Sequence, residues 1–190
     1  MAAKTTSDAT QCSPFPPDPN SSSSTINTVA REITSAGGKA TAISVDVRDY
    51  TSVQKLVEAT IATYGRLDVL VYNSGAIWWS SIANTPMKRF QLMQQVNPEG
   101  LYGCIQACLP HLCKNGKGRI IVVSPPIYSR FFRGKPAYAM GKVGMSVLTV
   151  GLSMDWKREG REGMAISSIW PAAVSISLLP CYQAPAKQFV

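Results

Sequence analysis

Short, continuous apolar segments alternate with amphipathic helical segments along this 190-residue chain. An uninterrupted apolar segment is typical of a strand buried on both faces, whereas apolar residues three and four apart indicate one face of a helix. The strands expected on this basis are 40–45, 69–71, 120–123 and 165–169. The alternation predicts an α/β fold with a parallel sheet covered by helices on both faces.

The expected helices are marked by residues that favour helix ends or interrupt helices. Gly65 ends a helix whose N-cap is Asp49 or Thr51. A second helix meets Pro98, which should kink or divide it because proline lacks an amide hydrogen and clashes with the preceding turn. A long helix is expected at 137–156.

Polar side chains stand at or just after the ends of three expected strands. These residues are Asp46, Asn73 and Ser124. In open parallel sheets, ligands bind beyond the carboxyl ends of the strands. The sequence therefore predicts a binding site at this edge of the sheet.

Tyr138 and Lys142 are four residues apart on the long expected helix, so their side chains project from the same face. A free tyrosine titrates near ~10, and a neighbouring ammonium favours the phenolate and lowers the pKa. The pair is therefore suited to proton transfer with a substrate oxygen. The same spacing also arises where an exposed lysine stem covers an aromatic ring, so the strand-end residues upstream are what favour catalysis.

The composition argues against several classes of function. The net charge is +8, but the basic residues are scattered and not interleaved with aromatic residues, so no nucleic-acid partner is predicted. No apolar segment reaches the ~18 to 20 residues of a membrane span, and the first residues lack the apolar core of a signal sequence. The odd count of five cysteines indicates a reducing compartment, either the cytoplasm or an organelle matrix.

Cys104, Cys108 and His111 fall on one helical face, close to Cys113, and this set could in principle hold zinc. The alternative is core packing, because free cysteine is among the most buried residue types and behaves as a small apolar group. Leu101 and other apolar residues surround the cysteines in the sequence. Core packing is the favoured interpretation, and no metal site is predicted.

Taken in order, the residues of interest resemble the short-chain dehydrogenase/reductase family. The residues that carry the resemblance are Asp46-Val47, Asn73-Ser74-Gly75, Asn97, Ser124, Tyr138 and Lys142. Ser124-Pro125-Pro126 and Trp170-Pro171 resemble the hydroxysteroid dehydrogenase-like subgroup of that family. The resemblance covers about residues 1–175 and implies a Rossmann-like, doubly wound parallel sheet.

The resemblance implies hydride transfer between a nicotinamide cofactor and a carbonyl or alcohol substrate. Tyr138 would give a proton to the substrate oxygen or take one from it, and Ser124 would hydrogen-bond that oxygen. Lys142 would lower the pKa of Tyr138 and hold the nicotinamide ribose. Asn97 would distort its helix and help a water connect Lys142 to solvent. A homo-oligomer through the two long helices, which begin at Pro86 and Ala137, is also implied.

The same resemblance assigns the cofactor-binding residues. Asp46 would hydrogen-bond the adenine and Val47 would line its pocket, while Asn73-Ser74-Gly75 would border the cofactor beside Tyr138 and Lys142. Lys4 stands where a cation meets the ribose phosphate in family members that prefer NADP. NADP is therefore expected rather than NAD.

The chain departs from the family pattern at its beginning. The family opens with a strand, a Gly-x-x-x-Gly-x-Gly turn and a helix, and no such turn follows an expected strand here. The Rossmann-like sheet is therefore expected to be incomplete, without its first β-α-β unit. The expected organisation is a strand remnant with a mobile Pro/Ser-rich loop at 1–24, the Rossmann-like domain at 25–175 and a divergent tail at 176–190.

Smaller departures affect the site itself. Pro125 stands where the family commonly has a second serine, which leaves Ser124 as the expected catalytic serine and Ser129 as a more distant substitute. Tyr72 replaces an asparagine, and Pro171 is not followed by glycine. Two functions stay open: an NADP-dependent oxidoreductase, or a truncated, non-catalytic relative that binds cofactor weakly or not at all.

Overall fold

The computed structural model describes residues 2–3, 26–114, 116–125, 127 and 132–170. Its elements are β1 (Ala2–Ala3), α1 (Ile26–Ser35), β2 (Ile43–Ser44), α2 (Tyr50–Tyr64), β3 (Val69–Tyr72), α3 (Met87–Gln94), the π-helix η1 (Gln95–Glu99), α4 (Gly100–Cys113), β4 (Arg119–Val123), α5 (Pro136–Arg158) and β5 (Ala165–Ile169). Most of the expected segment 1–24 and all of 176–190 lie outside the described residues.

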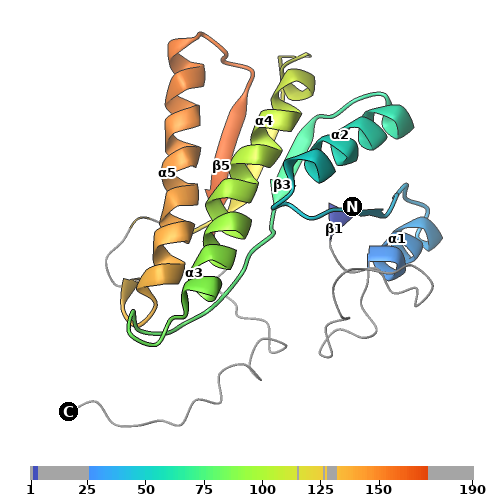
Figure 1. The fold of residues 1–190 in the computed structure, drawn as a ribbon. Helices are drawn as coiled ribbons and strands as arrows, with labels where there is room; N and C mark the ends of the chain where they lie inside the picture. Colours follow the sequence, from blue (N-terminus) through green and yellow to red (C-terminus); the bar gives the residue numbers. More distant parts are fainter. Residues whose placement is uncertain (1, 4–25, 115, 126, 128–131, 171–190) are drawn as a thin grey trace.

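The strands are parallel, as predicted, and form two sheets. Strands β3, β4 and β5 pair in sequence order, with Val71 opposite Ile121 and Val123 opposite Ile169. Strands β1 and β2 form a separate two-stranded sheet, so the Rossmann-like fold is incomplete over the described residues. Figure 1 shows β1 and α1 at one end of the molecule and α5 at the other.

One apolar core joins the three-stranded sheet to helices α2, α4 and α5. The strands contribute Tyr72, Ile120, Val122 and Ile166 to this core. The helices contribute Val53, Val57, Leu101, Cys104, Ile105, Cys108, Leu112, Met145 and Trp156. Cys104 and Cys108 are thus core residues, as the packing interpretation predicts. Burial raises the pKa of the Cys104 thiol to about 11 and that of Cys108 to about 12, which keeps both thiols protonated at neutral pH.

The helix ends follow from local sequence. The Asp49 side chain accepts a hydrogen bond from the backbone N–H of Thr51 and caps α2, and Gly65 ends α2 with a φ of 72°. The strand expected at 40–45 is shorter than predicted, because only Ile43 and Ser44 pair with β1. No helix within the described ranges is both long and apolar enough to cross a membrane.

Candidate active site

Asn97 lies in the middle of the π-helix η1 and is fully buried. Pro98 cannot donate a backbone hydrogen bond, and the helix accommodates it by widening to a π-turn between α3 and α4 rather than by breaking. The side chain of Asn97 pairs with both backbone groups of Ala76: Ala76 N donates to Oδ1 at 2.9 Å, and Nδ2 donates to Ala76 O at 3.1 Å. The π-helix is therefore bonded to the turn that follows β3.

Tyr72, at the end of β3, supports the same π-helix from the sheet. Its hydroxyl donates to the backbone oxygen of Val96 at 2.5 Å. Gly100 makes room for this contact, since a Cβ there would lie 2.5 Å from the Tyr72 oxygen. The departure from the family pattern at position 72 thus places a hydrogen bond directly beside Asn97.

Lys142 is buried on α5 and reaches the C-terminal end of β4, where Nζ donates to Val123 O at 2.8 Å. A Cβ at Gly75 would lie 3.6 Å from Lys142 Nζ and 3.6 Å from Asn97 Oδ1, so the turn after β3, the π-helix and α5 converge. Burial lowers the pKa of Lys142 to about 8. The ammonium is therefore close to its titration point near neutral pH.

Tyr138 lies one turn before Lys142 on α5, with 9% of its surface exposed. Gly141 lets this part of α5 approach the π-helix, because a Cβ there would be 3.4 Å from Pro98 Cδ. The sequence predicts that Lys142 lowers the pKa of Tyr138; in the structure burial is the governing cause, and it raises that pKa. The phenol is therefore protonated at neutral pH.

Trp78 and Trp79 pack against Tyr138 or its neighbours, each with a cation over its ring, and the sequence analysis missed all four residues. The Trp79 ring meets the Tyr138 ring edge to face, with centroids 6.2 Å apart. Lys135 Nζ lies 4.6 Å from the centroid of the Trp79 ring, and Arg89 Cζ lies 4.7 Å from that of Trp78. The signal in the sequence was the pair of adjacent tryptophans shortly after Asn73-Ser74-Gly75.

Ser124 follows β4 directly and is 2% exposed. Its backbone N–H bonds to Val122 O and Ile169 O, both at 3.1 Å, but its hydroxyl has no hydrogen-bond partner within the described part of the chain. A buried, unsatisfied hydroxyl is uncommon and indicates a place for a ligand oxygen. Ser129, the alternative serine, lies outside the described residues.

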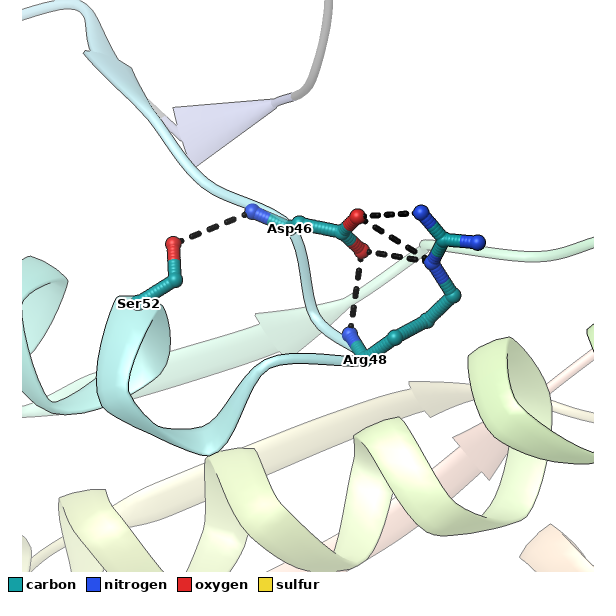
Figure 2. Close-up of polar contacts among 3 residues, drawn as sticks. All are labelled: Asp46, Arg48 and Ser52. Carbon is teal, nitrogen blue, oxygen red and sulfur yellow. Dashed lines mark hydrogen bonds and ion pairs between the residues drawn. The ribbon is translucent and has the colours of Figure 1, made fainter. Parts of the chain in front are cut away.

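Asp46 and Val47 belong to the nucleotide corner, which we define as residues 43–52. The Asp46 carboxylate accepts hydrogen bonds from the backbone N–H and the guanidinium of Arg48, at 2.5–3.1 Å (Figure 2). The hydroxyl of Ser52 accepts from Asp46 N at 3.2 Å. Arg48 therefore occupies the acceptor positions that an adenine amino group would use. Val47 lies next to the π-helix, with Cγ2 3.0 Å from a Cβ placed on Gly100.

The residues around Lys142 fit the nicotinamide end of a cofactor better than the residues around Asp46 fit its adenine end. Near Lys142, Gly75 is exposed and lacks a side chain, and the unsatisfied Ser124 hydroxyl belongs to the same edge of the sheet. Asn73 is exposed and Ser74 is partly buried in the same turn. At the adenine end, Asp46 is already paired with Arg48. Lys4, expected at the ribose phosphate, lies outside the described residues.

The site thus combines a parallel α/β sheet with a buried lysine, a tyrosine one helical turn away and an asparagine in a π-turn, at the edge where such sheets bind ligands. A family model described as short chain dehydrogenase matches residues 20–180. The chain belongs to the short-chain dehydrogenase family.

Known proteins similar to this chain agree with that assignment. Hydroxysteroid dehydrogenase-like protein 2 of Xenopus tropicalis is 38% identical over 149 residues, which is 77% of this chain and 35% of that protein. A short-chain dehydrogenase from Mycobacterium thermoresistibile has a TM-score of 0.79 at 31% identity, covering 95% of this chain and 61% of the other. A dehydrogenase/reductase from Sinorhizobium meliloti 1021 has a TM-score of 0.66 at 30% identity, and the match covers 76% of this chain and 56% of the other. The chain thus spans about a third of the length of its hydroxysteroid dehydrogenase-like relative.

Proposed function

We propose that the protein is an NADP-dependent oxidoreductase that reduces a carbonyl compound, with Tyr138, Lys142, Asn97 and Ser124 as its catalytic set. The observation that carries this proposal is the convergence of Lys142, Asn97 and the Gly75 turn beside Tyr138. These groups come from three separate elements and share one edge of the sheet, where parallel α/β folds bind ligands.

The chemistry follows from the states of the side chains. The nicotinamide would supply the hydride. Tyr138, held protonated by burial, donates its phenolic proton to the substrate oxygen as that oxygen gains charge. The Ser124 hydroxyl donates a hydrogen bond to the same oxygen and orients the carbonyl. The Lys142 ammonium, charged below a pH of about 8, stabilises the phenolate that remains.

In this scheme, Asn97 acts through the backbone. Its two bonds to Ala76 fix the turn that borders Lys142, so the lysine keeps its position when a ligand enters. Asp46, Val47 and the turn Asn73-Ser74-Gly75 complete the proposed cofactor site. A raised pKa at Tyr138 favours proton donation over proton removal, so we infer that reduction is the faster direction at neutral pH.

The test is binding followed by turnover with the full chain. NADPH should raise the melting temperature in a saturable way, because a ligand that binds only the folded state stabilises it. The variant Tyr138→Phe should keep this rise and lose NADPH-dependent reduction across a panel of aldehydes and ketones, while Lys117→Met, an exposed residue before β4, should leave both unchanged. Equal reduction rates for wild type and Tyr138→Phe would reject the proposed role of Tyr138.

A second candidate function is a non-catalytic relative that binds cofactor weakly or not at all. The observation that favours it is the Asp46–Arg48 pair, which must open before Asp46 can accept from adenine. The same thermal titration separates the two functions. No saturable rise with NADPH at any concentration, from a chain that melts cooperatively, would favour the second function over the first.

We also propose that two copies associate through α5. Met140, Val147, Val150 and Met154 are each more than half exposed and lie along one side of α5 at spacings of three, four and seven residues. A helix with such a stripe buries it against a partner helix, and a second copy supplies an identical stripe. Light scattering should give a dimer for wild type and a monomer for Val147→Glu; a monomeric wild type would exclude this interface.

A further inference from the structure

The net positive charge of the chain arises in one stretch of sequence. Residues 69–154 contain nine lysines and arginines and a single acidic residue, Glu99, whereas basic and acidic residues balance in the rest of the chain. The net charge of +8 therefore arises within this stretch, which includes Arg89, Lys135 and Lys142. A site of one charge sign attracts ligands of the opposite sign and raises their local concentration.

Two of these cations are held against aromatic rings beside Tyr138. Lys135 Nζ is 4.6 Å from the centroid of Trp79, and the Trp79 ring meets the Tyr138 ring at 66°. Arg89 contacts the neighbouring Trp78 in the same manner. Trp79 is 45% exposed although it adjoins the buried Tyr138. An exposed aromatic ring with a partly buried ammonium over it therefore lies next to the proposed proton donor.

On α5, Lys135 and Lys142 lie on opposite sides of Tyr138 along the helix axis. Along α5, Lys142 follows Tyr138 by four residues and adjoins Gly75 and Asn97, while Lys135 precedes Tyr138 by three residues as the N-cap of the helix. The first turn of α5 contains no acidic residue, so the positive end of the helix adds to the charge of Lys135. Burial lowers the pKa of Lys135, which indicates an ammonium with part of its hydration removed.

We propose that the carbonyl substrate of this site is an anion: an aldehyde or ketone with an acidic group bound by Lys135 and with an apolar or aromatic body against Trp79. The inference rests on the proposed oxidoreductase function and names its substrate class. An anionic group bound by a partly desolvated ammonium forms a charge-assisted hydrogen bond, which is stronger than a neutral one. The indole contributes apolar contact area and little conformational entropy loss.

Binding of a matched pair of probes tests the proposal without requiring turnover. The full chain is titrated with 2-naphthoate and with 2-naphthamide, its neutral counterpart, and tryptophan fluorescence is followed. We expect 2-naphthoate to bind about tenfold more tightly in wild type, as one charge-assisted hydrogen bond provides. Lys135→Met should remove the preference, Lys135→Arg should retain it, and Lys117→Met, which removes the same charge far from Tyr138, should also retain it.

Several results would overturn the proposal. Equal affinity of wild type for both probes would do so, as would a preference that survives in Lys135→Met. An equal loss of preference in Lys117→Met would show that general charge is the cause. Displacement of 2-naphthoate by saturating adenosine 2′,5′-bisphosphate would assign the cations to cofactor phosphates instead.

Turnover separates this inference from the function on which it rests. With NADPH, 4-carboxybenzaldehyde should be reduced at least about tenfold more efficiently than its methyl ester in wild type, and equally in Lys135→Met. Reduction of the ester at an equal or higher efficiency in wild type would reject the anionic substrate while keeping the oxidoreductase. Tight 2-naphthoate binding with no reduction of any carbonyl compound would reject the oxidoreductase while keeping an anion site at Lys135.

Discussion

The candidate active site and the nucleotide corner are held together by different kinds of contact. Around the active site, polar side chains bond to backbone groups far away in the sequence, as Asn97 does to Ala76 and Lys142 to Val123. In the nucleotide corner, the Asp46 carboxylate bonds to Arg48, two residues away (Figure 2). Long-range bonds form only when the fold forms, whereas a pair two residues apart can open while the fold stays intact.

The difference separates proton transfer from cofactor binding. The groups for proton transfer are positioned by the core before any ligand arrives, which is the arrangement that favours catalysis. The adenine corner can change its pairing at low cost, so cofactor affinity depends on a local competition for one carboxylate.

The largest effect is expected from the core beneath the active site. Leu101 is 0% exposed and packs where α4 meets the sheet, so Leu101→Ala should lower the free energy of unfolding by about 2–5 kcal/mol through lost apolar contact and a residual cavity. Ile33→Ala on α1, where the side chain is only partly buried, should cost less than half as much. Urea denaturation measures both, and equal losses would contradict the difference in burial between α4 and α1.

A slightly smaller effect is expected from the titration of Lys142. Burial lowers its pKa from 10.5 to about 8, so between these values the unfolded chain binds a proton that the folded chain does not, and stability rises with pH. Burying the charged ammonium lowers the free energy of unfolding by roughly 3 kcal/mol, and this cost is fully present below pH 8. Cys104 and Cys108 oppose this trend, because their raised pKa values make stability fall at high pH.

The comparison with Lys142→Met isolates the lysine, since the cysteines contribute equally to both proteins. Chemical denaturation is measured from pH 7 to 10.5. Over this range the free energy of unfolding of the wild type should rise by about 3 kcal/mol relative to that of Lys142→Met. If the difference in unfolding free energy between the two proteins stays constant across this range, Lys142 is solvated. The active site would then be no more rigid than the nucleotide corner.

Much of the fold could be predicted from the sequence because it depends on local signals. The Asp49 cap, the Gly65 end and the parallel strands are all confirmed. Apolar periodicity and capping residues report directly on helices and buried strands. The strand expected at 40–45 was overestimated, because pairing depends on a neighbouring strand that local sequence does not reveal.

The candidate site could be predicted only as a set of residues. Spacing on a helix places Tyr138 and Lys142 on one face, but the sequence does not report burial, which raises the pKa of Tyr138 instead of lowering it. The pairing of Asp46 with Arg48 and the contact of Tyr72 with Val96 are matters of side-chain geometry. Trp79 and Lys135 were missed because 56 residues separate them and only the fold brings them together.

An intermediate effect is expected where β3 supports the π-helix. Gly100→Ala places a Cβ 2.5 Å from the Tyr72 hydroxyl, so it should lower stability by about 1–3 kcal/mol through overpacking. Tyr72→Phe should cost about 1 kcal/mol for the lost hydrogen bond to Val96. The double variant should be less destabilised than the sum, because Tyr72→Phe removes the atom that clashes. Additive losses would mean that these two residues do not support Asn97 together.

The smallest effect on stability, and the sharpest contrast with the active site, is expected from Arg48→Met. The Asp46–Arg48 pair is about a quarter exposed and local, so its loss should change the free energy of unfolding by less than about 1 kcal/mol. The freed carboxylate can then accept from the adenine amino group, and the affinity for AMP should rise about threefold, whereas Asp46→Asn should lower it. Isothermal calorimetry measures both. A fall in affinity in Arg48→Met would show that Arg48 itself contacts the nucleotide, and the corner would then be as preorganised as the active site.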